Sequence, residues 1–166
     1  MATRSEIIRG IARIGTVING INPAAVFGPG TSEPDVNGVK GLPDDLSPHI
    51  RSGPAFVVLD GSTKVIPGYW ERETMELEGS VWSGVTPRAE RHAALVDLAD
   101  EVLAGFRAHD KGFLVDGVVQ AAVVTGFEPI ELRRWQFGDD PSIPVYLVLP
   151  FSIQVTVNRS VTYTPA

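Results

Sequence analysis

The sequence predicts an α+β fold, with a mixed, largely antiparallel β-sheet of about five strands packed against two α-helices. The prediction depends on the order of elements along the chain: a helix, a long irregular segment, two strands, a second helix and three further strands. A length of 166 residues suits one domain over residues 1–166. A content of 43% hydrophobic and 20% charged residues is typical of a globular protein.

The first helix is predicted over residues 4–18. Thr3 can cap its N-terminus, and Glu6 follows at the spacing of a capping box. Gly10 and Gly15 each weaken a helix by about 1 kcal/mol relative to alanine, so we expect packing against the rest of the domain to hold it. Four isoleucines recur at the helical period and form one apolar stripe: Ile7, Ile11, Ile14 and Ile18.

Residues 19–53 are expected to form a long loop of turns, because five prolines and six glycines interrupt any periodic pattern. Loops of this length are uncommon inside a domain and are usually functional or disordered. We therefore expect the segment to be mobile or to depend on a partner. Several of its apolar side chains are expected to dock on a neighbouring surface: Ile21, Val26, Phe27, Leu42 and Ile50.

Two strands are predicted next, over residues 55–59 and 69–81. A turn region at residues 64–68 would join them as a hairpin. The longer strand alternates between two faces, with Met75, Leu77 and Val81 on one and Glu76, Glu78 and Ser80 on the other.

The second helix is expected to have Thr86 as its capping residue and Pro87 at its first helical position, where the missing N–H costs nothing. It should end near His109. Its buried stripe is formed by Leu95, Leu98, Val102 and Phe106.

The remaining strands are predicted over residues 118–127, 130–137 and 144–157, separated by segments rich in proline, glycine and aspartate. Pro150 cannot donate a hydrogen bond to a neighbouring strand. Its position inside the last strand therefore implies a sheet edge or a β-bulge.

The composition argues against several kinds of site. The absence of cysteine excludes disulfides, thiolate metal ligands and cysteine nucleophiles. His49, His92 and His109 lack the spacing of metal ligands, and no serine, histidine and aspartate stand out as a catalytic set. The net charge of −6 argues against tight binding to nucleic acid. We expect a soluble protein that is not an enzyme and has no cofactor, metal or membrane-spanning segment.

Four acids fall within eight residues of the second predicted strand: Glu71, Glu73, Glu76 and Glu78. On a strand, the first two would share one face and the last two the opposite face. One interpretation is a solvated strand whose charge discourages edge pairing. A second is an acidic surface that faces something negative, such as passing DNA, and a third is a divalent-cation site.

Arg133, Arg134 and Trp135 form a second notable cluster on a predicted strand. Arginine and tryptophan are enriched in subunit interfaces, so these residues are candidates for such a contact. An alternative of equal weight is the rim of the core, with arginine stems covering it.

In the order of its elements and in their residue composition, the chain resembles the tail terminator (tail completion) proteins of long-tailed bacteriophages. The resemblance rests on the isoleucine-rich helix, the proline- and glycine-rich segment and the strand at residues 56–59. It continues through the strand pair, the helix at residues 95–106 and the closing strand at residues 146–157. It covers most of the chain but includes no diagnostic short motif.

This resemblance implies a structural subunit without catalytic residues. Such subunits form a ring, usually hexameric, that caps the major tail tube protein and meets the head–tail connector or stopper protein. DNA passes through without specific binding, and the protein is found in the neck of the virion and, during assembly, in the host cytoplasm. The acidic strand would then be a candidate for the ring lumen.

Other functions remain open on the sequence. Another phage neck or tail-tube subunit would share the virion setting but contact different neighbours. A small-molecule binding module outside phages would need a concave pocket with convergent polar groups. A hydrolase is the least favoured class, because no nucleophile with a matching base is evident.

Overall fold

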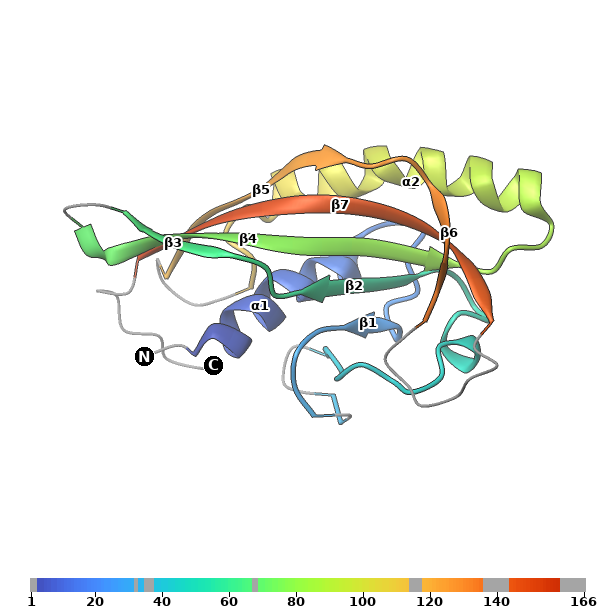
Figure 1. The fold of residues 1–166 in the computed structure, drawn as a ribbon, viewed down its shortest axis with the longest axis horizontal. Helices are drawn as coiled ribbons and strands as arrows, with labels where there is room; N and C mark the ends of the chain where they lie inside the picture. Colours follow the sequence, from blue (N-terminus) through green and yellow to red (C-terminus); the bar gives the residue numbers. More distant parts are fainter. Residues whose placement is uncertain are drawn as a thin grey trace.

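Strands from both halves of the chain form one sheet, and the helices lie against one of its faces (Figure 1). The computed structural model describes residues 3–31, 33–34, 38–66, 69–113, 118–135 and 144–158. The helices are α1 (Arg4–Ala12) and α2 (Arg88–Ala108), with 3₁₀ helices η1 (Arg13–Val17) and η2 (Ser47–His49). The strands are β1 (Val26–Phe27), β2 (Ala55–Leu59), β3 (Thr63–Ile66), β4 (Tyr69–Ser83), β5 (Val119–Phe127), β6 (Glu131–Arg134) and β7 (Val145–Asn158).

β4 and β7 form the centre of the sheet, paired antiparallel from Arg72 and Asn158 to Ser83 and Leu147. The strand order is β1-β2-β4-β7-β5, with β3 also beside β4 and β6 also beside β7. β1 runs parallel to β2, and the other pairings are antiparallel. The predicted α+β fold is confirmed. The described sheet has seven strands, where about five were expected.

The two unpredicted strands are short pieces at one side of the sheet. β1 has only two residues, too few to give a periodic signal. β3 occupies part of the segment predicted as a turn at residues 64–68, and residues 67–68 lie outside the described part of the chain. The predicted partners are correct, since β2 does pair with β4. β2 and β3 pair with successive parts of the same side of β4, and residues 60–62 separate the two strands.

The first helix is shorter than predicted. α1 ends at Ala12, and the chain continues as 3₁₀ helix η1, in which Thr16 donates a hydrogen bond from Oγ1 to the Arg13 carbonyl at 2.7 Å. A Cβ at Gly15 would collide with the ring of Phe56, so the chain passes close to the sheet there. The cap is as predicted, because Thr3 Oγ1 accepts the Glu6 N–H at 3.2 Å. All four isoleucines of the predicted stripe are buried: Ile7, Ile11, Ile14 and Ile18.

The second helix begins one residue later than predicted. Pro87 has an extended backbone, with ψ 127°, so it is the capping residue rather than the first helical residue, and Thr86 lies outside. The C-terminus is as predicted, with His109 at the C-cap. The predicted stripe is buried: Leu95, Leu98, Val102 and Phe106. Of the helices in the described ranges, none combines the length and apolarity needed to cross a bilayer.

The sheet separates two hydrophobic cores. On the helix side, Leu77 and Ile153 pack with the isoleucines of α1 and η1 and with the stripe of α2. On the opposite face, the loop before β2 packs Phe27 and Leu46 into a smaller cluster with Trp82. The expected docking of the loop is thus seen: Ile21, Val26 and Phe27 are buried, and Leu42 and Ile50 pack against the smaller cluster.

Pro150 lies in a central strand, so the predicted edge position is wrong for β7 as a whole. Its carbonyl accepts the Glu128 N–H at 2.9 Å, where the chain has left β5 and has not yet entered β6. The N–H and C=O of a strand residue point the same way, so the missing N–H of Pro150 faces this gap. The constraint on proline is met by a local break in the neighbouring strand.

Gly79 of β4 provides a test of the helix-side packing. A Cβ there would collide with the ring of Phe151, which lies over the glycine on β7. We expect Gly79→Ala to lower the free energy of unfolding by about 1–3 kcal/mol, because the ring must move in a filled core. Gly126→Ala on β5 is the control, since a Cβ there meets nothing within 4 Å. Urea unfolding of both variants measures the difference, and equal stabilities would contradict this packing.

Candidate functional site

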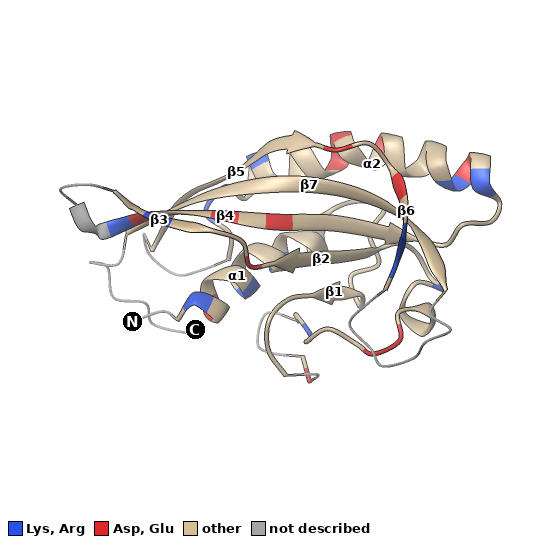
Figure 2. Ribbon diagram, viewed as in Figure 1, with Lys and Arg blue, Asp and Glu red and all other residues tan. Residues whose placement is uncertain are grey.

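The second face of the sheet is covered by the loop at one end only. Beyond the smaller core, β4, β7 and β5 expose a polar surface, which we call the open face. Along β4, Glu76 is half-buried and Glu78 is exposed, and both lie near the middle of the strand. Figure 2 shows acidic positions in red along β4. The open face consists of Thr74, Glu76 and Glu78 of β4, Ser152, Gln154 and Thr156 of β7, and Val123 and Thr125 of β5.

The registered neighbours of the two acids are uncharged. Gln154 lies opposite Glu76, and Ser152 lies opposite Glu78, both on β7. On the other side of β4, Leu59 of β2 faces Glu78. Like charges two residues apart on a strand, about 7 Å, repel by a few tenths of a kcal/mol in water, so this arrangement is tolerated.

Two basic residues lie at one end of the same face. Lys64 of β3 is opposite Thr74, and Arg72 of β4 shares the alternation of Glu76, so both belong to the end of the face beyond the acids. The rise of a strand puts Arg72 about 13 Å from Glu76 along β4. The face therefore has an acidic band in its middle and a basic band at its β3 end, and a further basic residue, Arg133 of β6, lies near Glu78 toward the other end.

The four acids of β4 do not act together. Glu73 lies on the helix side, in register with Val157, whereas Glu76 and Glu78 lie on the open face. The predicted division between opposite faces is thus confirmed for these three. The Glu71 side chain lies outside the described part of the structure.

Glu73 lies near Arg4, the first residue of α1. Arg4 donates to both carboxylate oxygens of Asp60, with Nε at 2.9 Å from each and Nη2 at 2.6 Å from Oδ1. This hydrogen bonding is the main cause of a raised pKa for Arg4, with the charges of Asp60 and Glu73 adding to it against the effect of burial. The same bond lowers the pKa of Asp60. The contact joins α1 to the break between β2 and β3.

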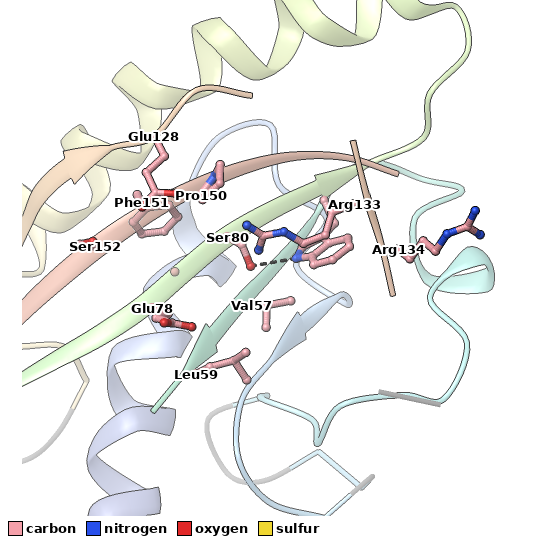
Figure 3. Close-up of a pocket in the computed structure, with 12 residues that line it drawn as sticks. Val57, Leu59, Glu78, Ser80, Glu128, Arg133, Arg134, Pro150, Phe151 and Ser152 are labelled. Atoms are coloured by element: carbon pink, nitrogen blue, oxygen red, sulfur yellow. Dashed lines mark hydrogen bonds between the residues drawn. The ribbon is translucent and has the colours of Figure 1, made fainter. Parts of the chain in front are cut away.

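A hollow of about 390 Å³ lies where the open face meets the smaller core (Figure 3). Trp82 contributes its indole to the lining, and its Nε1–H donates to Ser80 Oγ at 2.8 Å. The polar lining includes Glu78, Ser80, Glu128, Arg133 and Ser152. Sequence reasoning missed Trp82 because the predicted strand stopped at residue 81. The alternation of β4 continues to Ser83 and would have placed Trp82 on the face of Glu78.

The predicted cluster at residues 133–135 divides in the structure. Arg133 bonds the Glu131 carboxylate, with Nε at 2.8 Å from Oε1, and its guanidinium extends over the hollow toward Ser80. Arg134 also borders the hollow, but its side chain points away from it in Figure 3. Both arginines are exposed on β6 and stay candidates for a subunit contact.

Trp135 is a core residue of the chain itself. It is 1% exposed, and its ring meets Trp82 edge-on at 4.8 Å between centroids. Its Nε1–H donates to the Pro43 carbonyl at 2.8 Å. Of the two interpretations of the cluster, core packing describes Trp135, because no part of its ring is available to a neighbouring subunit in this arrangement.

Two further contacts hold the loop against the smaller core. The hydroxyls of Ser47 and Tyr146 are 2.6 Å apart. The His49 ring meets Phe27 edge-on at 5.2 Å between centroids. Burial, followed by the nearby charge of Lys40, lowers the pKa of His49, so the neutral ring is favoured beside Phe27.

In the described ranges, no group of three or more histidine, aspartate or glutamate side chains is placed to hold a metal ion. No family model matches the sequence, and no curated protein is significantly similar to it.

Truncation distinguishes the core role of Trp135 from a surface role. We expect Trp135→Ala to lower the free energy of unfolding by about 3–5 kcal/mol, because it removes a buried ring and leaves a cavity beside Trp82. Arg133→Ala on the same segment should change it by no more than about 0.5 kcal/mol, since the side chain is exposed. Chemical denaturation of the two variants measures this, and a mild effect of Trp135→Ala would contradict the core assignment.

Proposed function

We propose that this chain is a structural virion subunit, a tail terminator that forms a ring, caps the tail tube and joins it to the head-side connector. Its partners would be copies of itself, the major tail tube protein and the connector or stopper protein. The proposal assigns no catalytic residue and no cofactor. Its setting would be the neck of the virion, and the host cytoplasm during assembly.

The observation that carries the proposal is the inequality of the two sheet faces. One face is covered by helices, while the other leaves a polar surface with Glu76 and Glu78 in its middle. A sheet with one polar face is suited to line a channel, because polar side chains can face water there while the apolar core lies behind them. A closed ring further requires two different contact surfaces on each copy.

Charge also supports a channel for DNA. Two open-face acids from each of six copies would gather twelve carboxylates in one band and focus their field. DNA could slide past such a band, because binding to the backbone depends on basic residues replacing counterions. The basic band of Lys64 and Arg72 would form a separate level of the channel.

A small-molecule binding module is the second candidate, favoured by the hollow beside Arg133. An arginine and two carboxylates, Glu78 and Glu128, around an indole and two serines would suit a small molecule that carries both charges. Thermal-shift screening of such zwitterions, with Arg133→Ala as control, tests this alternative.

The ring itself is the first test. We expect native mass measurement and electron microscopy of the chain, alone and in particles that contain it, to show a closed ring, because each copy would offer two different surfaces to its neighbours. A two-fold dimer as the only assembly would contradict the proposed function, since a dimer leaves no channel along the tail axis.

Reversal of charge tests the channel face. We expect Glu76→Lys with Glu78→Lys to slow DNA passage through the ring and to produce DNA retention that falls with salt, because the open face becomes basic along its length. Asp97→Lys with Asp100→Lys, on the exposed side of α2, makes the same charge change elsewhere. Rates of DNA ejection measure the effect. Unchanged ejection in the Glu76 and Glu78 variant would contradict a lumenal open face.

A further inference from the structure

The sheet ends on a strand edge at each side. β3 pairs with β4, and β5 pairs with β7; neither has a second strand partner within the described residues. The two edges carry exposed apolar side chains, with Val65 of β3 58% exposed and Val123 of β5 52% exposed. An unpaired edge with apolar side chains is a template for pairing with another chain.

The directions of the two edge strands are compatible with each other. β3, β4, β7 and β5 are neighbours in this order, and each step is antiparallel. β5 therefore runs opposite to β3. If the β3 of a second copy lies beside β5 of the first, the antiparallel alternation continues without interruption, and the same contact can repeat from copy to copy.

The main-chain groups match at one residue of each edge, and a register irregularity directly after each of the two limits the pairing to a short stretch. The Glu76 N–H donates to the Ser62 carbonyl at 2.7 Å, so Ser62 and Lys64 face β4 and Val65 points its N–H and C=O outward. On β5, the Ala122 N–H points outward and is already bonded to the Asp110 carbonyl, so this edge is open only from Val123 onward. By alternation, Val124 then also directs its N–H and C=O outward.

The side chains of these two residues lie on the same face. Val65 is in register with Glu73, and Val124 with Ile153, so both lie on the helix side of the sheet. Beside Val124, a hollow of about 300 Å³ opens between β5 and α2. Leu103 and Phe106 contribute its apolar lining, and Arg107 and Asp110 lie at its polar side. An exposed valine on the incoming strand would find an apolar recess there.

We propose that neighbouring copies of this chain join by antiparallel pairing of β3 with β5, placing Val65 of one copy opposite Val124 of the next. This inference rests on the ring-forming function proposed above and names its subunit contact. It is a heterologous contact, since the two surfaces differ, and such contacts form a ring when the rotation from copy to copy closes.

The stagger of this pairing is that of a closed barrel. Through Glu73 of β4, Val65 is in register with Val157 of β7. Val124 is in register with Ile153, which lies four residues away along β7. Each copy contributes four strands at this level, so the stagger is one residue per strand. That is the ratio of an eight-stranded barrel with a shear of 8, whose strands tilt by about 36°.

Cysteine cross-linking tests the pairing, because the chain has no cysteine of its own. A variant with Val65→Cys and Val124→Cys should oxidise to a ladder of covalent oligomers that ends at the ring. Directly opposed residues of an antiparallel pair are about 5.5 Å apart at Cα, within the range for a disulfide. Val65→Cys with Val123→Cys is the matched control, since Val123 lies one residue away on the opposite face and should give no ladder.

A second measurement tests ring assembly in variants without introduced cysteines. Val65→Asp should abolish the ring in native mass measurement, whereas Val17→Asp, at a valine of η1 that is 50% exposed, should leave it intact. Rings without cross-links at residues 65 and 124, or equal cross-linking in the control pair, would overturn the edge contact and leave the ring function standing. A chain that stays monomeric and uncross-linked would overturn both.

Discussion

The antiparallel ladder between β4 and β7 is the interaction on which the other contacts depend. Its register decides which face each side chain of the two longest strands occupies, and both flanking pairs of strands attach to it. A slip of β4 by one residue would move Leu77 onto the open face and carry Glu76 into the core. The cost of burying a carboxylate without a partner is large enough to make the observed register strongly preferred.

The same ladder explains why the loop covers only part of the second face. Toward Ser83, β4 presents Trp82 to that side, and the loop can bury its own aromatic and aliphatic side chains there. Toward the middle of the strand the exposed residues are Glu78 and its polar neighbours on β7. A loop placed over them would remove a carboxylate from water without a partner, so the acids mark the point where the cover ends.

Much of the fold follows from local patterns, and the departures have identifiable causes. The helical stripe of α2 and the alternation of β4 and β7 were sufficient to predict those elements and the opposite faces of Glu73 and Glu76. β1 and β3 were missed because a strand of two to four residues has too little periodicity to register, and its pairing depends on a partner distant in sequence. The 3₁₀ helix that replaces the last turns of the predicted helix brings Gly15 against Phe56, a tertiary contact that no local pattern contains.

The site was harder to predict than the fold for the same reason. Arginine and tryptophan in one segment indicate an interface and a core equally well, and only the packing of Trp135 on Trp82 separates the two. The hollow at Arg133 joins residues from β2, β4, β6 and β7, so its existence depends on the sheet order rather than on any one strand. The matching of Val65 with Val124 likewise depends on the direction and register of every strand between them.

A ring joined through its sheet edges also determines which face lies inside. Paired edges make the sheets of neighbouring copies continuous, so one face must look inward and the other outward. α1, η1 and α2 thicken one face, and the thicker layer needs the larger circumference, which places the open face toward the axis.

Six copies would contribute twenty-four strands at this level. With strands about 4.8 Å apart and tilted by about 36°, opposite backbones would stand about 45 Å apart. Where the loop does not cover the sheet, such a channel has room for duplex DNA after side chains are added, and Glu76 and Glu78 would face it there in every copy. In the proposed ring, the edge contact and the charge of the channel would therefore both follow from a single arrangement of the sheet.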